Sequence, residues 1–302
     1  MSPEMTTLSN APKPPPPLAH DAHKGIAGRV LCLAGSETMP GAALLVARAA
    51  QRAGAGLVTL ATFDRNVIYP AAVAVPEAIY IDLSRSKDLI AGRLPAQLVG
   101  RGDHARVAGP GLGRGGRTDE LIRRVVEDDF DGPLVLDADG LNIIGATPEV
   151  LAQCRGPLVL TPHHGEASRL LGRDRIPSAD AERIEVAQQL ARSSSGICVL
   201  KGHHTVVTDG EQTFVNPTGN PAMATAGSGD VLSGILGAYL AYSHELQSSD
   251  WNVFEAVCSG VYMHGLAGDI AVETLGERAV TASVLIDHLG VAQLQHQRAP
   301  RG

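Results

Sequence analysis

NPTGNPAMATAGSGDVLSGILG, residues 216–237, is the stretch that decides the fold of this chain. It contains five glycines, and Gly227-Ser228-Gly229-Asp230 leads directly into apolar residues that recur at helical spacing from Val231 to Leu240. Glycines let the backbone approach a ligand closely, and the free N–H groups of a helix N-terminus attract anions such as phosphate. The stretch therefore predicts a phosphate-binding loop that opens a helix, although an acidic residue in a first turn is also typical of an ordinary helix start.

The composition favours one α/β domain. The chain has 302 residues, of which 44% are hydrophobic and only 3% are aromatic, and it contains 34 glycines. A core built from small and aliphatic side chains is typical of helices packed on a parallel sheet. The net charge of −7 offers no basic surface, so we expect no nucleic-acid partner.

The cysteines and the apolar runs indicate a cellular compartment. Cys32, Cys154, Cys198 and Cys258 are scattered and form no CxxC pair, which favours free thiols over disulfides or a metal site. We find neither a secretory signal nor a run long enough to span a membrane. The expected location is the cytoplasm, with no membrane partner.

Short apolar runs alternate with helical segments along most of the chain. Residues 1–22 are rich in proline and are expected to form a disordered tail, and residues 23–297 are expected to form a single domain. The expected strands cover residues 29–34, 57–61, 79–81, 105–108, 134–136, 158–160, 197–200 and 205–207. The expected helices cover the segment that starts at residue 41 and residues 118–128, 148–153, 165–171, 178–194, 231–242, 252–274 and 281–296. The pattern predicts a mostly parallel sheet covered by helices on both faces.

Polar motifs follow four of these strands, at the point where each strand ends. They are Gly109–Gly113, Asp137–Asn142, Thr161–Glu166 and Lys201–Thr205. Each motif alone could be a helix cap, a turn or a solvated charge. Because ligands of such sheets bind beyond the carboxyl ends of the strands, their common position predicts one cleft. The adjacent histidine pairs within two of the motifs lack the spacing of helical zinc ligands, so we expect no transition-metal site.

Six sequence blocks carry a resemblance to a known family. In chain order they are GRVLCLAGSETMPGAALLVARAAQRAGAGLVTLAT, VAGPGLGR, PLVLDADGLNII, LTPHHGEASRLLG, VLKGHHTVVTDG and NPTGNPAMATAGSGDVLSGIL. These blocks resemble the ADP- or ATP-dependent NAD(P)H-hydrate dehydratases, which belong to the ribokinase-like superfamily. The resemblance extends from about residue 23 to about residue 289. It implies a ribokinase-like three-layer α/β/α sandwich with a mostly parallel sheet.

The resemblance also implies an activity. Members of this family dehydrate (6S)-NADHX or (6S)-NADPHX back to NADH or NADPH while a nucleotide is consumed. Bacterial members typically use ADP, possibly ATP, and release AMP and phosphate, and Mg²⁺ accompanies the nucleotide. For this chain the resemblance therefore implies an ADP-dependent lyase that repairs nicotinamide cofactors.

The family's sites transfer to particular residues of this sequence. The residues expected to bind the adenine nucleotide are Lys201, Gly202, His203, His204, Thr205 and Gly229. Those expected to contact the hydrate are Ala42, Gly111, His163 and Asp230. Asp230 is the expected catalytic base, and Gly227, Ser228 and Gly229 form the expected phosphate loop.

Two alternative functions share this loop. A kinase of the same superfamily that phosphorylates a small alcohol, such as a vitamin precursor, would need the same base. The blocks around residues 41–45, 109–113 and 161–166 favour the dehydratase. A nucleotide-binding sensor without chemistry is the other alternative, and the intact Asp230 argues against it because an anionic group near phosphates does not help binding.

Some positions depart from the family pattern. His164 stands where many relatives have proline, which leaves the path of the loop after Pro162 open, and Ala226 stands where many have glycine. The N-terminal epimerase domain found in many relatives does not precede residue 28, so a separate epimerase is an expected pathway partner. Relatives also suggest a homotetramer.

Overall fold

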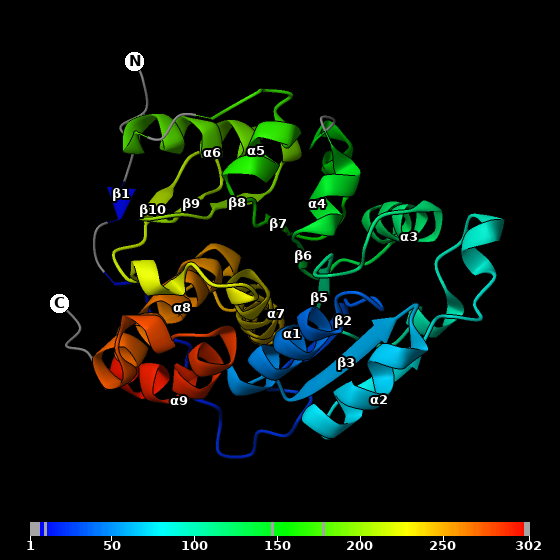
Figure 1. Ribbon diagram of the computed structural model, residues 1–302, viewed down its shortest axis with the longest axis horizontal. Coiled ribbons are helices and arrows are strands. Elements are labelled where there is room, and N and C mark those ends of the chain that lie inside the picture. Colours follow the sequence, from blue (N-terminus) through cyan, green and yellow to red (C-terminus); the bar gives the residue numbers. More distant parts are fainter. Residues whose placement is uncertain (1–6, 9–10, 146–147, 177–178, 299–302) are drawn as a thin grey trace.

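A ten-stranded sheet runs through the computed structural model, which describes residues 7–8, 11–145, 148–176 and 179–298 (Figure 1). From one edge to the other its strands are β1 (Thr7–Leu8), β10 (Thr213–Val215), β9 (Val206–Thr208), β8 (Ile197–Leu200), β7 (Leu158–Leu160), β6 (Leu134–Leu136), β5 (Ala105–Ala108), β2 (Arg29–Leu33), β3 (Leu57–Thr62) and β4 (Ile79–Asp82). The seven strands from β8 to β4 pair in parallel, so their carboxyl ends share one edge. Only β9 pairs antiparallel with its neighbours β8 and β10.

Helices cover both faces of this sheet and make it the middle of three layers (Figure 1). One face carries α1 (Pro40–Arg52), α2 (Arg65–Ala74), α7 (Ser228–Leu246), α8 (Val253–Leu275) and α9 (Ala282–Arg298). The other carries α3 (Gly116–Val126), α4 (Asp139–Ile144), α5 (His164–Leu170) and α6 (Asp180–Ser194). Short 3₁₀ helices lie between these elements, namely η1 (Asp88–Ala91), η2 (Ala96–Leu98), η3 (Pro148–Gln153), η4 (Pro221–Met223) and η5 (Glu277–Ala279).

Two hydrophobic cores, one on each face, explain why the strands read as unbroken apolar runs. Successive side chains of a strand point to opposite faces. In β2, Val30 and Cys32 therefore join the core under α1 and α7, whereas Leu31 and Leu33 join the core under α3 and α4. Because both faces are buried, both sets must be apolar.

The N-terminal segment lies against this body through backbone carbonyl groups. Pro12 is buried, and its carbonyl oxygen lies 2.7 Å from Nε2 of His296 in α9. The indole N–H of Trp251 donates to the Lys13 carbonyl (3.3 Å), and the Tyr242 hydroxyl donates to the Pro17 carbonyl (3.2 Å). Residues 1–6 and 9–10 of the expected tail lie outside the described residues. The division into a tail of residues 1–22 and a domain of residues 23–297 stays a prediction.

The predicted α/β/α architecture is confirmed, and every expected strand is present within one or two residues. Two strands that pair at one edge, β1 and β10, were missed, and β1 falls in the segment expected to be a disordered tail. Helices α2 and α4 were also missed. α2 carries Pro70 in its interior, a residue that normally signals a helix break. The segment 148–153 is a 3₁₀ turn rather than an α-helix.

Candidate active site

The glycine-rich loop opens α7 at the carboxyl edge of the sheet. Gly227 is the N-cap residue with φ +86°, in the left-handed region that favours glycine. A Cβ atom there would lie 2.4 Å from Cδ1 of Leu45 in α1, so a larger residue would also clash. Ser228 and Gly229 follow as the first helical residues, and Asp230 lies in the first turn. The predicted helix start is therefore confirmed, with α7 beginning three residues earlier than expected, and phosphate binding by this loop stays a prediction.

Asp230 is the carboxylate of this loop, and its surroundings change its pKa. Its pKa is raised from the ordinary 3.8 to about 6, first because the group is buried and then because Asp137 and Asp139 are negative neighbours, while Lys201 opposes the shift. Within the described residues, neither oxygen of Asp230 takes part in a side-chain hydrogen bond or an ion pair. A free carboxylate whose pKa lies near neutrality suits a general base.

A second carboxylate, Asp137, lies beside it and is fully bonded. Asp137 follows β6 and is 1% exposed. Its Oδ1 lies 2.7 Å from Lys201 Nζ, and its Oδ2 accepts a hydrogen bond of 2.7 Å from the Ser233 hydroxyl one turn along α7. Asp137 is therefore committed to structure.

Lys201 is surrounded by more negative charge than it can neutralise. Its Nζ also lies 3.9 Å from Oε2 of Glu166, a residue that is 4% exposed. Burial acts to lower the pKa of Lys201, but Asp137, Glu166 and Asp230 outweigh it, so the pKa is raised and the side chain stays charged. Burial raises the pKa of Glu166, and Asp137 adds to that rise against Lys201. The carboxyl edge of the sheet therefore has more carboxylates than cations, and a bound cation or proton would reduce the repulsion between them.

Backbone strain marks the same place. Ala138 lies between the two aspartates with φ 49° and ψ −116°, a combination that costs energy for a residue with a Cβ atom. Gly109, with φ +125°, packs so closely that an added Cβ would lie 1.9 Å from the Asp137 carbonyl oxygen. Asp139 accepts a hydrogen bond of 2.8 Å from the Gly113 N–H. These contacts fix the Gly109–Gly113 loop against the end of β6.

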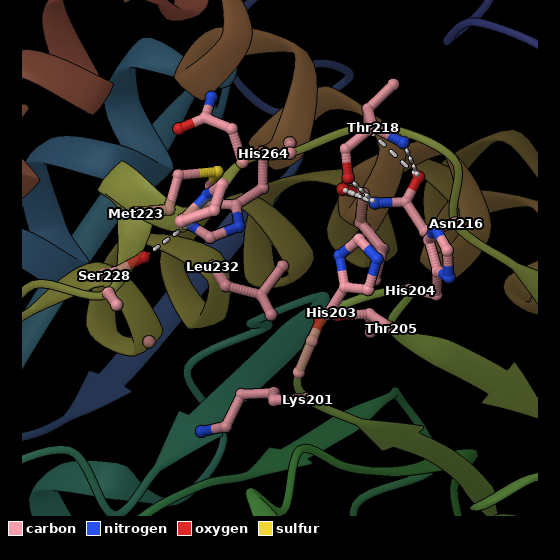
Figure 2. Close-up of a pocket in the computed structure, with 18 residues that line it drawn as sticks. Lys201, His203, His204, Thr205, Asn216, Thr218, Met223, Ser228, Leu232 and His264 are labelled. Carbon is pink, nitrogen blue, oxygen red and sulfur yellow. Dashed lines mark hydrogen bonds between the residues drawn. The ribbon is translucent and has the colours of Figure 1, made fainter. Parts of the chain in front are cut away.

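A cavity of about 380 Å³ opens beside this charged cluster (Figure 2). It is lined on one side by the loop Lys201–Thr205, which follows β8, and on another by residues of 216–224. Ser228, Gly229 and Leu232 of α7 and Val261, His264 and Gly265 of α8 complete it. All six residues predicted for the nucleotide therefore surround one cavity, of a size that is typical of small-ligand sites.

The loop Lys201–Thr205 turns instead of running extended. His204 has φ 52°, and the rings of His203 and His204 stack with centroids 3.8 Å apart. In an extended chain two adjacent side chains would point to opposite sides, whereas the turn here brings both rings together. The Thr205 hydroxyl closes the turn by donating to the Gly202 carbonyl at 3.0 Å.

Arg183 of α6 supports this loop from beneath. Its side chain is buried, and Nη1 donates to the carbonyl oxygens of His203 and His204, the latter at 3.3 Å. Nη2 donates to the Leu200 carbonyl at 3.5 Å. Sequence reasoning missed this residue, because an arginine in a charged helix gives no sign that its guanidinium points inward.

The residues expected at the hydrate lie on the neighbouring strand ends. Gly111 has φ +61° and lies against α1, where an added Cβ would be 2.6 Å from the Cβ of Ala42. His163 is the N-cap of α5, and its Nδ1 accepts a hydrogen bond of 2.9 Å from the Gly165 N–H. Burial lowers the pKa of His163, and Lys201 lowers it further. α5 begins at His164, which answers the question about the loop after Pro162.

Several residues of the site were missed or weighed as ordinary structure. Glu166 lay within a block already singled out, and Asp137 followed a strand directly, so their positions carried a signal. Ser233, His264 and Asp269 carried none on their own, since each is a polar residue inside a largely apolar helix. A polar residue on a helical face that is otherwise buried is the pattern that could have found them.

Residues 7–8, 11–145, 148–176 and 179–298 contain neither a metal-binding cluster nor a membrane-spanning helix. There, no group of three or more His, Cys, Asp or Glu side chains is arranged to hold a metal ion. None of the helices in these ranges combines the length and the apolar character that a bilayer crossing requires. The four cysteines are free, and Cys32, Cys198 and Cys258 are buried.

Comparisons with known proteins agree on one family. A sequence profile described as NAD(P)H-hydrate dehydratase matches residues 30–290. The ADP-dependent (S)-NAD(P)H-hydrate dehydratase of Neisseria meningitidis is 37% identical over 262 residues, which cover 85% of this chain and 82% of that protein. The bifunctional NAD(P)H-hydrate repair enzyme Nnr of Thermofilum pendens is 37% identical over 285 residues, 93% of this chain and 52% of that enzyme. The chain thus spans about half the length of such bifunctional relatives.

A solved structure has a similar fold. The ADP/ATP-dependent NAD(P)H-hydrate dehydratase of Bacillus subtilis, co-crystallized with ATP/Mg²⁺, superposes with a TM-score of 0.78 at 29% identity. The match covers 96% of this chain and all of that one.

Proposed function

This chain belongs to the NAD(P)H-hydrate dehydratase family, and we propose that it removes water from (6S)-NADHX or (6S)-NADPHX in an ADP-dependent reaction that returns NADH or NADPH. AMP and phosphate are the other products. The observation that carries the proposal is the free Asp230 carboxylate, with its pKa raised to about 6, at the glycine-lined start of α7. It directly follows Ser228 and Gly229, which line the cavity that suits a nucleotide.

The first step is phosphoryl transfer to the hydroxyl group of the hydrate. The oxygen forms a bond to the terminal phosphorus of ADP, the bond from that phosphorus to AMP breaks, and Asp230 accepts the hydroxyl proton. The backbone N–H groups of Ser228 and Gly229 stabilise charge on the transferring group. Lys201, charged and next to Gly229, adds to that stabilisation.

The second step is elimination. The phosphorylated oxygen leaves as phosphate with the electrons of its carbon–oxygen bond, and the lone pair of the ring nitrogen stabilises the carbon that remains. The neighbouring ring carbon then gives up a proton to the released phosphate, and the electrons of its carbon–hydrogen bond restore the ring double bond. Phosphorylation is needed because hydroxide is a poor leaving group at neutral pH.

Magnesium accompanies the nucleotide in this proposal. The described residues offer no dedicated cage of three ligands, but a Mg²⁺ ion bound to phosphates usually takes only one or two protein carboxylates. Asp139 is a carboxylate at the site that is not assigned to proton transfer, and the excess of negative charge around Lys201 fits a cation. When bound, the ion would neutralise charge on the phosphates.

An assay with purified hydrate tests the proposal. Incubation of the protein with NADHX and ADP should restore the absorbance of NADH, and parallel reactions with ATP and with NADPHX give the preferences. A superfamily kinase of a small alcohol, which the family relationship disfavours, would leave a stable phosphorylated product and no NADH. Tight ADP binding without any turnover would instead indicate a sensor.

Three features of the sequence-based picture remain part of the proposal. These are a homotetrameric state, a cytoplasmic location and a separate epimerase that supplies the S epimer. Sedimentation of the purified protein tests the first, since a tetramer of 31.4 kDa subunits is easily separated from a monomer.

A further inference from the structure

Several residues of the segment 216–228, which borders the cavity, form hydrogen bonds with α8. The Asn216 side-chain amide donates to the Val261 carbonyl at 3.4 Å, and the Thr218 hydroxyl donates to the Tyr262 carbonyl at 2.9 Å. Figure 2 shows Asn216 and Thr218 facing each other on this wall of the cavity. Both receiving carbonyls belong to α8, so its backbone is the platform for the start of the segment.

Asp269, two turns further along α8, fixes the middle of the segment. Its Oδ2 accepts a hydrogen bond of 2.9 Å from the Gly219 N–H, and its Oδ1 accepts one of 2.9 Å from the Asn220 side chain. Asn220 in turn accepts from the Ala222 N–H at 3.1 Å and so caps η4. Gly219 and Asn220 line the cavity, whereas Asp269 lies behind them.

Small residues let the two elements approach. A Cβ at Gly265 would lie 2.3 Å from Thr218 Oγ1, and a Cβ at Gly268 would lie 2.3 Å from Met223 Sδ. Both glycines have helical φ values within α8, so close approach rather than backbone conformation explains them.

His264 links the same helix to the phosphate loop. Its Nε2 lies 3.2 Å from the Ser228 hydroxyl, and the ring lines the cavity (Figure 2). Burial lowers the pKa of His264 to about 4, so the ring is neutral. One helix thus contacts both the segment that borders the cavity and the loop that precedes Asp230.

We propose that Asp269 is a positioning residue for the nucleotide, which acts through its two hydrogen bonds to Gly219 and Asn220 and keeps that wall of the cavity in its binding shape. The proposal rests on the proposed function, because the nucleotide is the ligand of this cavity. Asp269 does not touch the ligand, the hydrate or the reacting atoms. Its loss affects ADP binding and leaves the chemistry at Asp230 unchanged.

Asp269→Asn is the test variant, and Glu273→Gln is its matched control. Asn at position 269 keeps the shape but offers only one acceptor to two donors, so one donor is left unpaired. Glu273 is an exposed carboxylate one turn further along α8, and its replacement removes the same charge. Gly268→Ala is a second variant, since it displaces Met223 without adding a polar group or lining the cavity itself.

The measurements are ADP affinity by calorimetry, the two KM values, kcat and the unfolding temperature. We expect the Kd and KM for ADP to rise about 10-fold in Asp269→Asn, with the KM for the hydrate and kcat at saturating ADP within about 3-fold. Gly268→Ala should shift the same two quantities by a smaller factor, and Glu273→Gln should shift none.

Two results would overturn the inference. One is an ADP Kd for Asp269→Asn equal to that of Glu273→Gln, and the other is a rise in the hydrate KM as large as the rise for ADP, which would mean general loosening. If the wild-type protein itself failed to bind ADP, the proposed function would fall as well. Calorimetry needs no turnover, so it distinguishes a failure of the Asp269 inference from a failure of the proposed function.

Discussion

The two ends of the parallel strands carry buried charge in different ways. At the amino ends, Arg106 pairs with Asp128 at 2.6 Å and stacks on Phe130, and Arg101 lies 3.4 Å from Asp103. Asp103 and Asp128 therefore each have an arginine within ion-pair distance. At the carboxyl ends, Lys201 lies among Asp137, Glu166 and Asp230, close to the strained backbone of Ala138.

That difference separates structural charge from functional charge. An arginine–carboxylate pair balances its own charge, whereas the carboxylates around Lys201 carry more negative charge than one ammonium group balances until a proton, a cation or a substrate arrives. Burial raises the pKa of Asp103 as it does that of Asp230, even though Arg101 and Arg106 oppose the shift. A raised pKa alone therefore does not identify the catalytic group, and its surroundings must.

The largest expected effect is on turnover. Asp230→Asn preserves shape but removes the base, so kcat should fall about 100-fold or more, with little change in the ADP Kd. Asp103→Asn is the control from the opposite edge and should leave kcat unchanged. Equal kcat values for the two variants, measured with NADHX and ADP, would contradict the distinction between the two ends of the strands.

Lys201→Met should cost stability as well as activity. It leaves Asp137, which is 1% exposed, as a buried charge without its partner, and such a loss is worth about 3 kcal/mol. Chemical denaturation gives the free energy of unfolding, and calorimetry gives the expected rise in the ADP Kd. A variant as stable as the wild type would show that water replaces the ammonium group.

The pH profile should report Asp230. The base must be ionised, so with a pKa of about 6 the value of kcat/KM should fall about 10-fold for each pH unit below that point. In Asp230→Asn, the residual activity should lack this limb. A profile flat down to pH 5 would contradict the assignment of Asp230 as the base.

The same shift predicts a stability change of opposite sign. The folded-state pKa of Asp230 lies above its ordinary 3.8, so the folded protein binds this proton more tightly. Stability is therefore lost as pH rises from about 4 to 6, and the cost persists above pH 6. Asp230→Asn removes that cost and should unfold at a higher temperature than the wild type at pH 7, but not at pH 4.

Arg106→Met should have the smallest effect. Asp128 is partly exposed, so water can solvate it after the arginine is lost, and the expected cost is about 1–2 kcal/mol. Both KM values and kcat should stay at wild-type levels, because nothing at the amino ends faces the cavity. A change in either KM would show that the two edges are coupled.

The strand and helix pattern was largely readable from the sequence because both faces of the sheet are covered. Continuous apolar runs such as residues 134–136 and 158–160 have no alternative that buries both sets of side chains. The elements that were missed, such as β10 and α4, are short and depend on neighbours rather than on their own periodicity.

The sequence by itself determined that polar motifs follow the strands and that a glycine loop opens a helix before Asp230. It did so because the positions of strands along the chain and the starts of helices depend on local periodicity and backbone preference. Only the tertiary structure decided that Arg183 and Asp269 converge on this place, since the backbone groups that they bind lie 17 to 50 residues away along the chain. It also decided the charge state of Asp230, because desolvation depends on what surrounds a group in space and not on its neighbours in the chain.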